Sequence, residues 1–146
     1  MSYDPQAGFP RIMPSLRYAD VGAALDWLHE AFGLVEHLRW VAPDGTVQHA
    51  EMRIGTAYVE LSRGGEGYRN PRTLGASCAT LVVFVDHVDR HAERSRSAGA
   101  TILAEPADKP WGLRQYLAAD PEGHRWEFSE FLRDVLPEEW GAQLAD

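Results

Sequence analysis

The stretch from residue 111 to residue 128, WGLRQYLAADPEGHRWEF, predicts two short strands joined by a tight turn. In the turn DPEG (120–123), proline presets φ at the second position and glycine tolerates the positive φ that closes the hairpin. Alternation along the second strand puts Trp126 and Phe128 on one face and Arg125 and Glu127 on the other. The apolar face is expected to pack against a helix. The polar face needs water, a partner or a ligand, so functional residues are sought there.

The chain upstream of this hairpin contains a repeated pattern. A strand, an aspartate suited to cap a helix, a helix and a terminating glycine occur twice, at Asp20 to Gly33 and at Asp86 to Gly99, both 13 residues apart (33 − 20 and 99 − 86). A unit that cannot close its own sheet is expected to combine with its copy. The sequence therefore predicts an α+β fold of two tandem β-α-β-β-β modules, which form a cupped, partly closed mixed sheet with helices outside.

The predicted segments follow from turn and breaker signals. They are an N-terminal lead-in (1–10), a first module (11–62), a glycine-rich linker (63–78), a second module (79–129) and a C-terminal tail (130–146). The predicted strands are 11–18, 35–42, 47–54, 57–62, 80–85, 101–104, 114–118 and 124–128, and the predicted helices are 21–32 and 87–98.

Composition narrows the class of function. The net charge of −8 argues against nucleic-acid binding, which needs basic patches, and favours cationic or neutral partners. No apolar run approaches the ~18 residues of a membrane span. The single cysteine, Cys78, excludes an intrachain disulfide and fits a reducing cytosol, and we expect it to be buried before the apolar run 81–85. A cytoplasmic protein is expected.

Four sequence pieces resemble the vicinal oxygen chelate superfamily, which contains glyoxalase I, bleomycin-resistance proteins and extradiol dioxygenases. They are LRYADVGAALDWLHEAFGL, HAEMRIG, YVELS and WGLRQYLAADPEGHRWEF. The resemblance covers about residues 11–130 and is greatest to the bleomycin-resistance-like branch. It implies a homodimer. The superfamily includes lyases, isomerases, dioxygenases and binding proteins, so the fold alone does not fix the function.

The resemblance also implies where a divalent metal would be held, by one first-strand and one last-strand residue of each module. Alignment on the two aspartates places these positions at Met13, Glu60, Thr80 and Glu127. Two carboxylates without imidazole or thiolate are a poor donor set for a transition metal, and Met13 offers no oxygen to magnesium or calcium. No cofactor is expected, and a divalent metal remains the alternative.

One histidine is predicted on the cavity side of the first module. If Pro43 faces Thr46 in the hairpin, Trp40 lies opposite His49, and Leu38 lies opposite Glu51 on the same face. His49 is then either a proton shuttle, or a substitute metal ligand beside Glu51 and Glu60, or the partner of Trp40 in a cross-strand stack with a structural hydrogen bond.

Glu60 and Glu127 are predicted to face inward, 67 residues apart in equivalent strands. They either recognise a cationic guest or perform acid–base work, or they form salt bridges with strand arginines. Those arginines are Arg17, Arg53, Arg114 and Arg125.

Aromatic side chains with a few polar groups are the usual lining of a ligand pocket. The candidate ligand-binding residues are Trp40, His49, Glu51, Tyr58, Glu60, Trp111, Arg114, Tyr116 and Glu127, and the catalytic candidates are His49, Glu51 and Glu127.

We expect a metal-free small-molecule binding protein that confers antibiotic resistance by sequestering an antibiotic or that holds a metabolite. The alternative is an enzyme. It would be a metal-dependent lyase, isomerase or dioxygenase with its site rearranged to His49, Glu51, Glu60 and Glu127, or a metal-free acid–base variant. The expected partners are a small molecule and a second copy of the chain, with no nucleic acid and no membrane.

Overall fold

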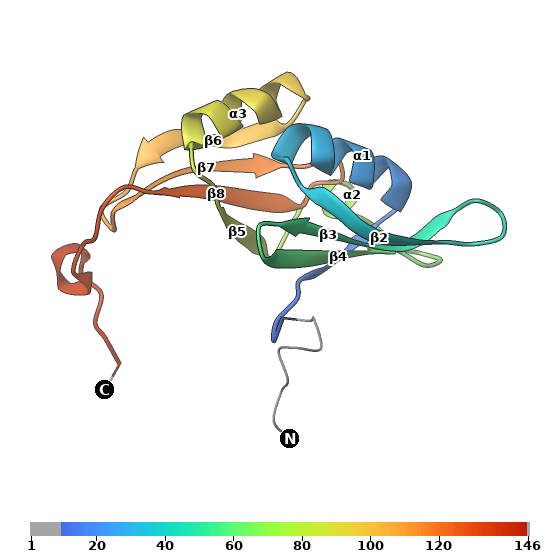
Figure 1. The fold of residues 1–146 in the computed structure, drawn as a ribbon, viewed down its shortest axis with the longest axis horizontal. Helices are drawn as coiled ribbons and strands as arrows, with labels where there is room; N and C mark the ends of the chain where they lie inside the picture. Colours follow the sequence, from blue (N-terminus) through green and yellow to red (C-terminus); the bar gives the residue numbers. More distant parts are fainter. Residues whose placement is uncertain (1–9, 146) are drawn as a thin grey trace. The chain divides into compact units, whose positions relative to one another are not determined.

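The computed structural model describes residues 10–145, which divide into two compact units, one ending at Ala76 and the other starting at Ser77. Each unit is a four-stranded mixed sheet with a helix on one face (Figure 1). The predicted α+β fold with two tandem modules is therefore confirmed. The predicted lead-in 1–10 lies outside the described residues, except for Pro10. No helix within residues 10–145 is long and apolar enough to cross a membrane.

The first unit has the sheet order β1-β4-β3-β2, in which β1 runs parallel to β4 and the other neighbours are antiparallel. Its elements are β1 (Ser15–Tyr18), α1 (Val21–Phe32), β2 (Val35–Val41), β3 (Val47–Ile54), β4 (Ala57–Arg63) and α2 (Pro71–Leu74).

The second unit repeats this topology in the order β5-β8-β7-β6, with β5 parallel to β8. Its elements are β5 (Thr80–Phe84), α3 (Val88–Ser97), β6 (Thr101–Asp108), β7 (Leu113–Ala119), β8 (Arg125–Phe131) and a 3₁₀ helix, η2 (Pro137–Trp140).

Helix α1 has the start and end that its sequence predicts. The Asp20 carboxylate accepts a hydrogen bond from the backbone N–H of Ala23 (2.9 Å), and Gly33 closes the helix in the left-handed conformation. All six residues of the predicted apolar stripe are buried, namely Val21, Ala24, Leu25, Leu28, Ala31 and Phe32. They cover the sheet side that carries Ala50 and Met52.

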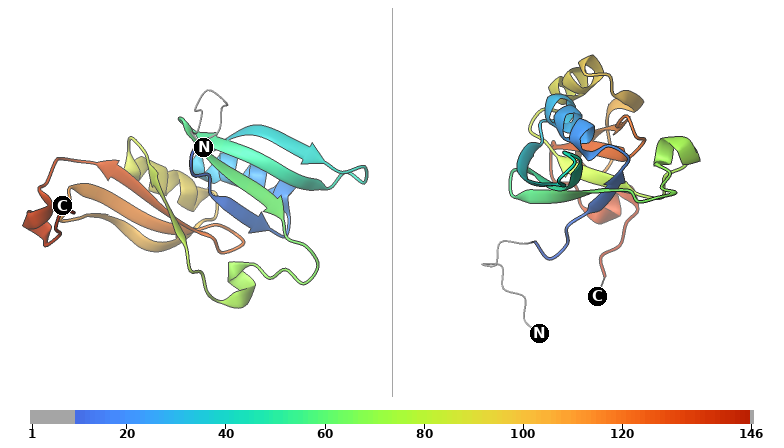
Figure 2. Two further views of the ribbon diagram at one scale, coloured as in Figure 1. Left: turned by 90° about the horizontal axis from the view of Figure 1, so that it is seen from below. Right: turned by 90° about the vertical axis from the view of Figure 1, so that its right-hand side faces the viewer.

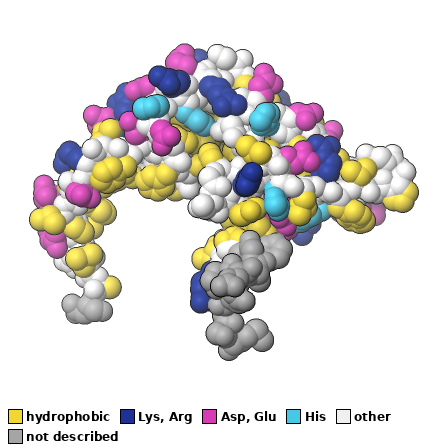
Figure 3. All heavy atoms as spheres, viewed as in Figure 1, with side chains coloured by type: hydrophobic (Ala, Val, Ile, Leu, Met, Phe, Trp, Pro, Cys, Tyr) yellow, Lys and Arg dark blue, Asp and Glu magenta, His cyan; other side chains and the backbone are white. Residues whose placement is uncertain are grey.

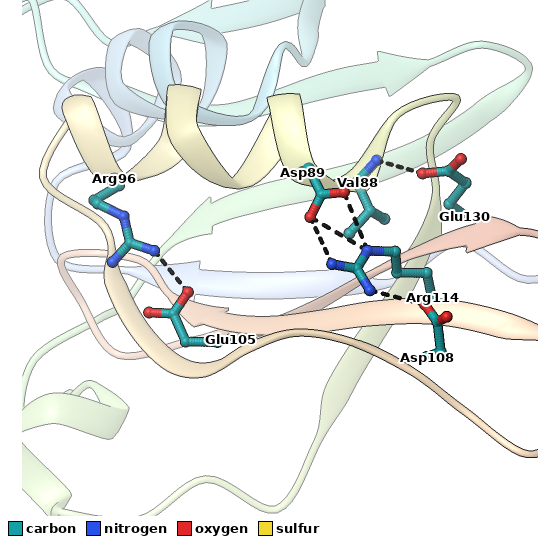
Figure 4. A network of polar contacts seen from close by, with 7 residues as sticks. All are labelled: Val88, Asp89, Arg96, Glu105, Asp108, Arg114 and Glu130. Carbon is teal, nitrogen blue, oxygen red and sulfur yellow. Dashed lines mark hydrogen bonds and ion pairs between the residues drawn. The ribbon is translucent and has the colours of Figure 1, made fainter.

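Helix α3 starts one residue later than predicted, and the prediction of Asp86 as its cap is wrong. His87 occupies the cap position without a side-chain hydrogen bond, and the carboxylate of Glu130 on β8 accepts the Val88 N–H instead (2.8 Å; Figure 4). Beside it, Arg114 forms ion pairs with Asp89 of α3 (2.9 Å) and with Asp108 (2.8 Å). Hydrogen bonds to Asp89 and then to Asp108 raise the pKa of Arg114 above its ordinary value.

The hairpin of β7 and β8 is anchored by a buried carboxylate in its turn. Asp120 is 4% exposed. One of its oxygens accepts the backbone N–H groups of Glu122 (3.1 Å) and His124 (3.0 Å), and the other accepts the indole N–H of Trp126 (3.2 Å). Trp126 and Phe128 are buried on the helix side, as the alternation predicts. The turn is therefore held by its first residue as well as by its proline and glycine.

Other departures from the predicted segments have local causes. The first strand is shorter than predicted because it begins only after Pro14, and β6 continues through Pro106 because it is an edge strand with a bulge there. The predicted linker contains α2, capped by Asn70.

Cys78 is exposed, so its predicted burial is wrong. On the tail, Figure 3 shows hydrophobic and acidic side chains close together around η2.

Replacement of Asp120 tests the anchored turn. Asp120→Ala leaves the buried indole N–H of Trp126 and two backbone N–H groups without their acceptor. We expect the free energy of unfolding to fall by about 2–4 kcal/mol in urea denaturation. The control is Asp44→Ala in the exposed turn between β2 and β3, where the Thr46 N–H is bonded at the surface and a much smaller loss is expected. Equal losses in the two variants would contradict the anchoring role.

Candidate functional site

Each sheet has one face covered by its helix (Figure 2, left). The second face, here called the open face, carries polar side chains. In the first unit the β2–β3 register pairs Trp40 with His49 and Leu38 with Glu51, as predicted. The β3–β4 register places Glu51 opposite Glu60. Because side chains alternate along a strand, all five lie on the open face of the first unit. The premise about the turn is wrong, because Ala42 and not Pro43 bonds to Thr46, and a register shift between Trp40 and Val41 restores the predicted pairs.

Hydroxyl groups hold Glu60 on this face. One oxygen of its carboxylate accepts hydrogen bonds from Ser15 on β1 (2.9 Å) and from Ser62 on β4 (3.3 Å). The Ser62 oxygen also contacts Nδ1 of His49, which lies across the strands at 3.2 Å. His49 therefore has a hydrogen-bonded partner and lies opposite Trp40, as the structural alternative predicts.

Glu51 lies beside this cluster and is 7% exposed. Oε1 of its carboxylate lies 3.9 Å from Nε2 of His49. Within residues 10–145, neither Glu51 nor Glu60 forms an ion pair with an arginine or a lysine. The predicted alternative of a salt bridge to a strand arginine is therefore not formed at Glu60.

The open face of the second unit has a similar arrangement around Glu127. The side-chain amide of Gln115 on β7 donates to Glu127 (3.1 Å) and to the hydroxyl of Ser129 (2.7 Å), and its carbonyl accepts the indole N–H of Trp111 (3.0 Å). The ring of Trp111 contacts Trp140 of η2 edge-on, with centroids 5.9 Å apart. Glu127, like Glu60, has neutral donors and no arginine or lysine partner among the described residues.

The two glutamates occupy equivalent positions in the two units. Each is followed two residues later by a serine, in ELS (60–62) and EFS (127–129), and that serine has a polar side chain opposite it on the neighbouring strand, His49 or Gln115. Sequence reasoning missed Gln115 and the serines because they are neutral. The repeated Glu-x-Ser pattern is the signal that could have found two of them.

Three other residues that were predicted to bind the ligand lie on different faces of their sheets. Tyr58 lies on the open face of the first unit, opposite Arg53, and its ring meets His37 edge-on. Tyr116 and Arg114, by contrast, lie on the helix side of the second sheet, which corrects their predicted place in a pocket. Tyr116 pairs with Phe128 across the strands and is 1% exposed. The pocket prediction rested on its aromatic side chain, but the alternation of side chains along β7 determines which face it lies on.

The phenol of Tyr116 is bonded to Ser95 (3.0 Å) and to Nδ1 of His91 (2.6 Å). Burial raises its pKa to about 12, against a smaller opposite effect of Ser95.

The positions at which the superfamily holds a metal were tested against the side chains found there. Thr80 lies opposite Arg125 on β8, whereas Val82 and Ser15 are the strand partners of Glu127 and Glu60. Met13 precedes β1. Within residues 10–145 no group of three histidine, cysteine, aspartate or glutamate side chains is placed to hold a metal. The four superfamily positions thus carry two carboxylates, a hydroxyl and a thioether, without imidazole or thiolate.

Comparison with known sequences identifies the family. The sequence model of the Glyoxalase/Bleomycin resistance protein/Dioxygenase superfamily matches residues 8–128. The chain belongs to this superfamily. An uncharacterized protein of Mycobacterium tuberculosis is 34% identical over 142 residues, which cover 93% of this chain and 83% of that protein.

Solved structures of superfamily members are similar in fold. TioX from Micromonospora sp. ML1 is 43% identical, with a TM-score of 0.70 over 85% of this chain and 100% of the TioX chain. A mutant of the fosfomycin resistance protein FosX from Listeria monocytogenes was solved with Mn(II) and 1S,2S-dihydroxypropylphosphonic acid. It is 15% identical, with a TM-score of 0.61 over 88% of this chain and 93% of its own, and shares the fold alone.

The raised pKa of Tyr116 gives a prediction at alkaline pH. The folded state favours the neutral phenol of Tyr116. The contribution of this phenol to stability is therefore complete below the tyrosine pKa of about 10 in the unfolded chain, and it is lost as the pH rises through about 12. Tyr116→Phe should remove one phenolate transition near pH 12 from an ultraviolet titration of the folded protein. If the lost transition instead occurs at the ordinary tyrosine value, the predicted burial effect is wrong.

Proposed function

We propose that this chain binds a small, cationic organic molecule on its open faces without a metal ion. The supporting observation is that Glu60 and Glu127 are held by neutral donors. Neutral hydrogen bonds orient a carboxylate but leave its charge uncompensated, so a cationic ligand would supply the missing partner. The net charge of −8 favours the approach of such a ligand.

Aromatic side chains beside these carboxylates support the same proposal. In the first unit, Trp40 is 62% exposed and lies opposite His49, and in the second unit the exposed Trp111 is oriented by Gln115. A planar or cationic ligand would stack on an indole ring while a glutamate takes its charge. Trp40, Tyr58 and Trp111 are the aromatic members of the proposed site.

The biological role that we propose is sequestration of an antibiotic or a related metabolite by a cytoplasmic homodimer. The superfamily includes bleomycin resistance proteins, and TioX is a related member of known structure. On the second unit, Val82, Phe84 and Phe131 expose apolar surface that a ligand or a second copy would cover.

The alternative function is a metal-dependent lyase, isomerase or dioxygenase with a rearranged site. Its favouring observation is that Glu60 and Glu127 stand at the last-strand metal positions of the superfamily. The donor set gives it little support, because His49 is the one imidazole among its proposed ligands His49, Glu51, Glu60 and Glu127, and imidazole is the donor that suits a transition metal.

Metal content separates the two functions. Protein dialysed against nickel, zinc, manganese or iron(II) and then against metal-free buffer should retain far less than one equivalent per chain by elemental analysis. Retention of one equivalent that is lost in Glu60→Gln or Glu127→Gln would instead support the enzyme.

Ligand titration tests the proposed binding. Aromatic ammonium compounds should quench tryptophan fluorescence and bind more tightly than neutral compounds of the same shape. Glu60→Gln or Glu127→Gln should weaken binding of the cation about tenfold, a loss of ~1.4 kcal/mol, because a charged partner is removed. Glu138→Gln, on the exposed 3₁₀ helix η2, makes the same change in net charge and should have little effect. Equal weakening by all three substitutions would mean that net charge, not the open faces, governs binding.

A further inference from the structure

We propose that His49 and Glu51 form a subsite that accepts two N–H hydrogens from a primary ammonium group of the ligand. This inference rests on the proposed function, since it specifies the chemical group that the open face of the first unit would recognise. It goes further because it specifies a hydrogen-bonding requirement of the ligand at two other residues, His49 and Glu51.

The hydrogen bonds of the serine-held cluster fix the tautomer of His49. An ionised carboxylate can only accept hydrogen bonds, so the single hydroxyl hydrogen of Ser62 is donated to Glu60 (3.3 Å). The contact of 3.2 Å between the Ser62 oxygen and Nδ1 of His49 then requires Nδ1 to be the donor. Neutral His49 therefore carries its hydrogen on Nδ1.

With its hydrogen on Nδ1, the ring presents a lone pair at Nε2, and Nε2 lies 3.9 Å from Oε1 of Glu51. Two acceptors thus lie near each other at a separation too long for a direct hydrogen bond. A single donor atom with at least two hydrogens can bond to both, whereas a donor with one hydrogen satisfies only one of them.

Burial and charge select the kind of donor. The side chain of Glu51 retains 9% of its exposure and has no ion-pair partner in residues 10–145 other than His49, so its charge is poorly compensated. The side chain of His49 is 30% exposed and provides access from the solvent side. A primary ammonium has three hydrogens and a compensating charge. A quaternary ammonium has the charge without the hydrogens, and an alcohol has one hydrogen and no charge.

The first test is the tautomer itself, read in the free protein. Two-bond ¹H–¹⁵N correlations of histidine-labelled protein at neutral pH should show His49, assigned by its loss in His49→Gln, as the Nδ1–H tautomer. Ser62→Ala removes the acceptor of Nδ1 and should shift His49 toward the Nε2–H form. An Nε2–H or doubly protonated His49 in the wild-type protein would overturn the proposal.

The second test compares benzylammonium, benzyltrimethylammonium and benzyl alcohol. We expect benzylammonium to shift the Nε2 resonance and to bind about tenfold more tightly than the quaternary compound, because only the former donates hydrogen bonds. Glu51→Gln should abolish this preference, and Glu138→Gln should retain it.

The outcomes distinguish this subsite from the function on which it rests. If both cations bind equally and more tightly than the alcohol, the open faces bind cations but the subsite at His49 and Glu51 is wrong. If neither cation binds more tightly than the alcohol, both proposals fall.

Discussion

The packing of one amphipathic helix against one face of each sheet determines which side chains are left for function. In the first unit α1 buries its apolar stripe over β2, β3 and β4, and in the second unit α3 covers β6, β7 and β8. Because strand residues alternate between faces, this packing sends Glu51 and Glu60 to one open face and Glu127 to the other. A shift of one residue in register would exchange the core for the polar set.

On the two open faces, neutral side chains donate hydrogen bonds to the carboxylates of Glu60 and Glu127. Hydroxyl groups hold Glu60, and the amide of Gln115 holds Glu127, whereas the nearby Arg114 is occupied with aspartates on the helix side. By the same alternation Arg17, Arg53 and Arg125 also lie on the open faces, but none of them forms a salt bridge with Glu51, Glu60 or Glu127 among the described residues. His49 is the one imidazole beside these carboxylates in the cluster of the first unit, and imidazole is the donor that a transition metal prefers.

Much of the fold could be predicted because its signals are local. Asp20 and Gly33 mark the ends of α1, and Asp120, Pro121 and Gly123 mark the turn between β7 and β8. What failed depends on contacts between distant residues. The α3 cap comes from Glu130, 42 residues after Val88, and no local pattern announces it. Tyr116 was placed in a pocket by its residue type, although its pairing with Phe128 requires the core side.

The central claim is that the charge of Glu60 and Glu127 is available to a cationic ligand. The most direct measurement follows the side-chain carboxyl carbon resonances of glutamate by NMR during titration with an aromatic ammonium compound, with its neutral alcohol as the reference. We expect the signals of Glu60 or Glu127 to shift with the cation and to stay in place with the alcohol and with divalent metals. Carboxyl signals that ignore the cation but shift on addition of one equivalent of a divalent metal would contradict it.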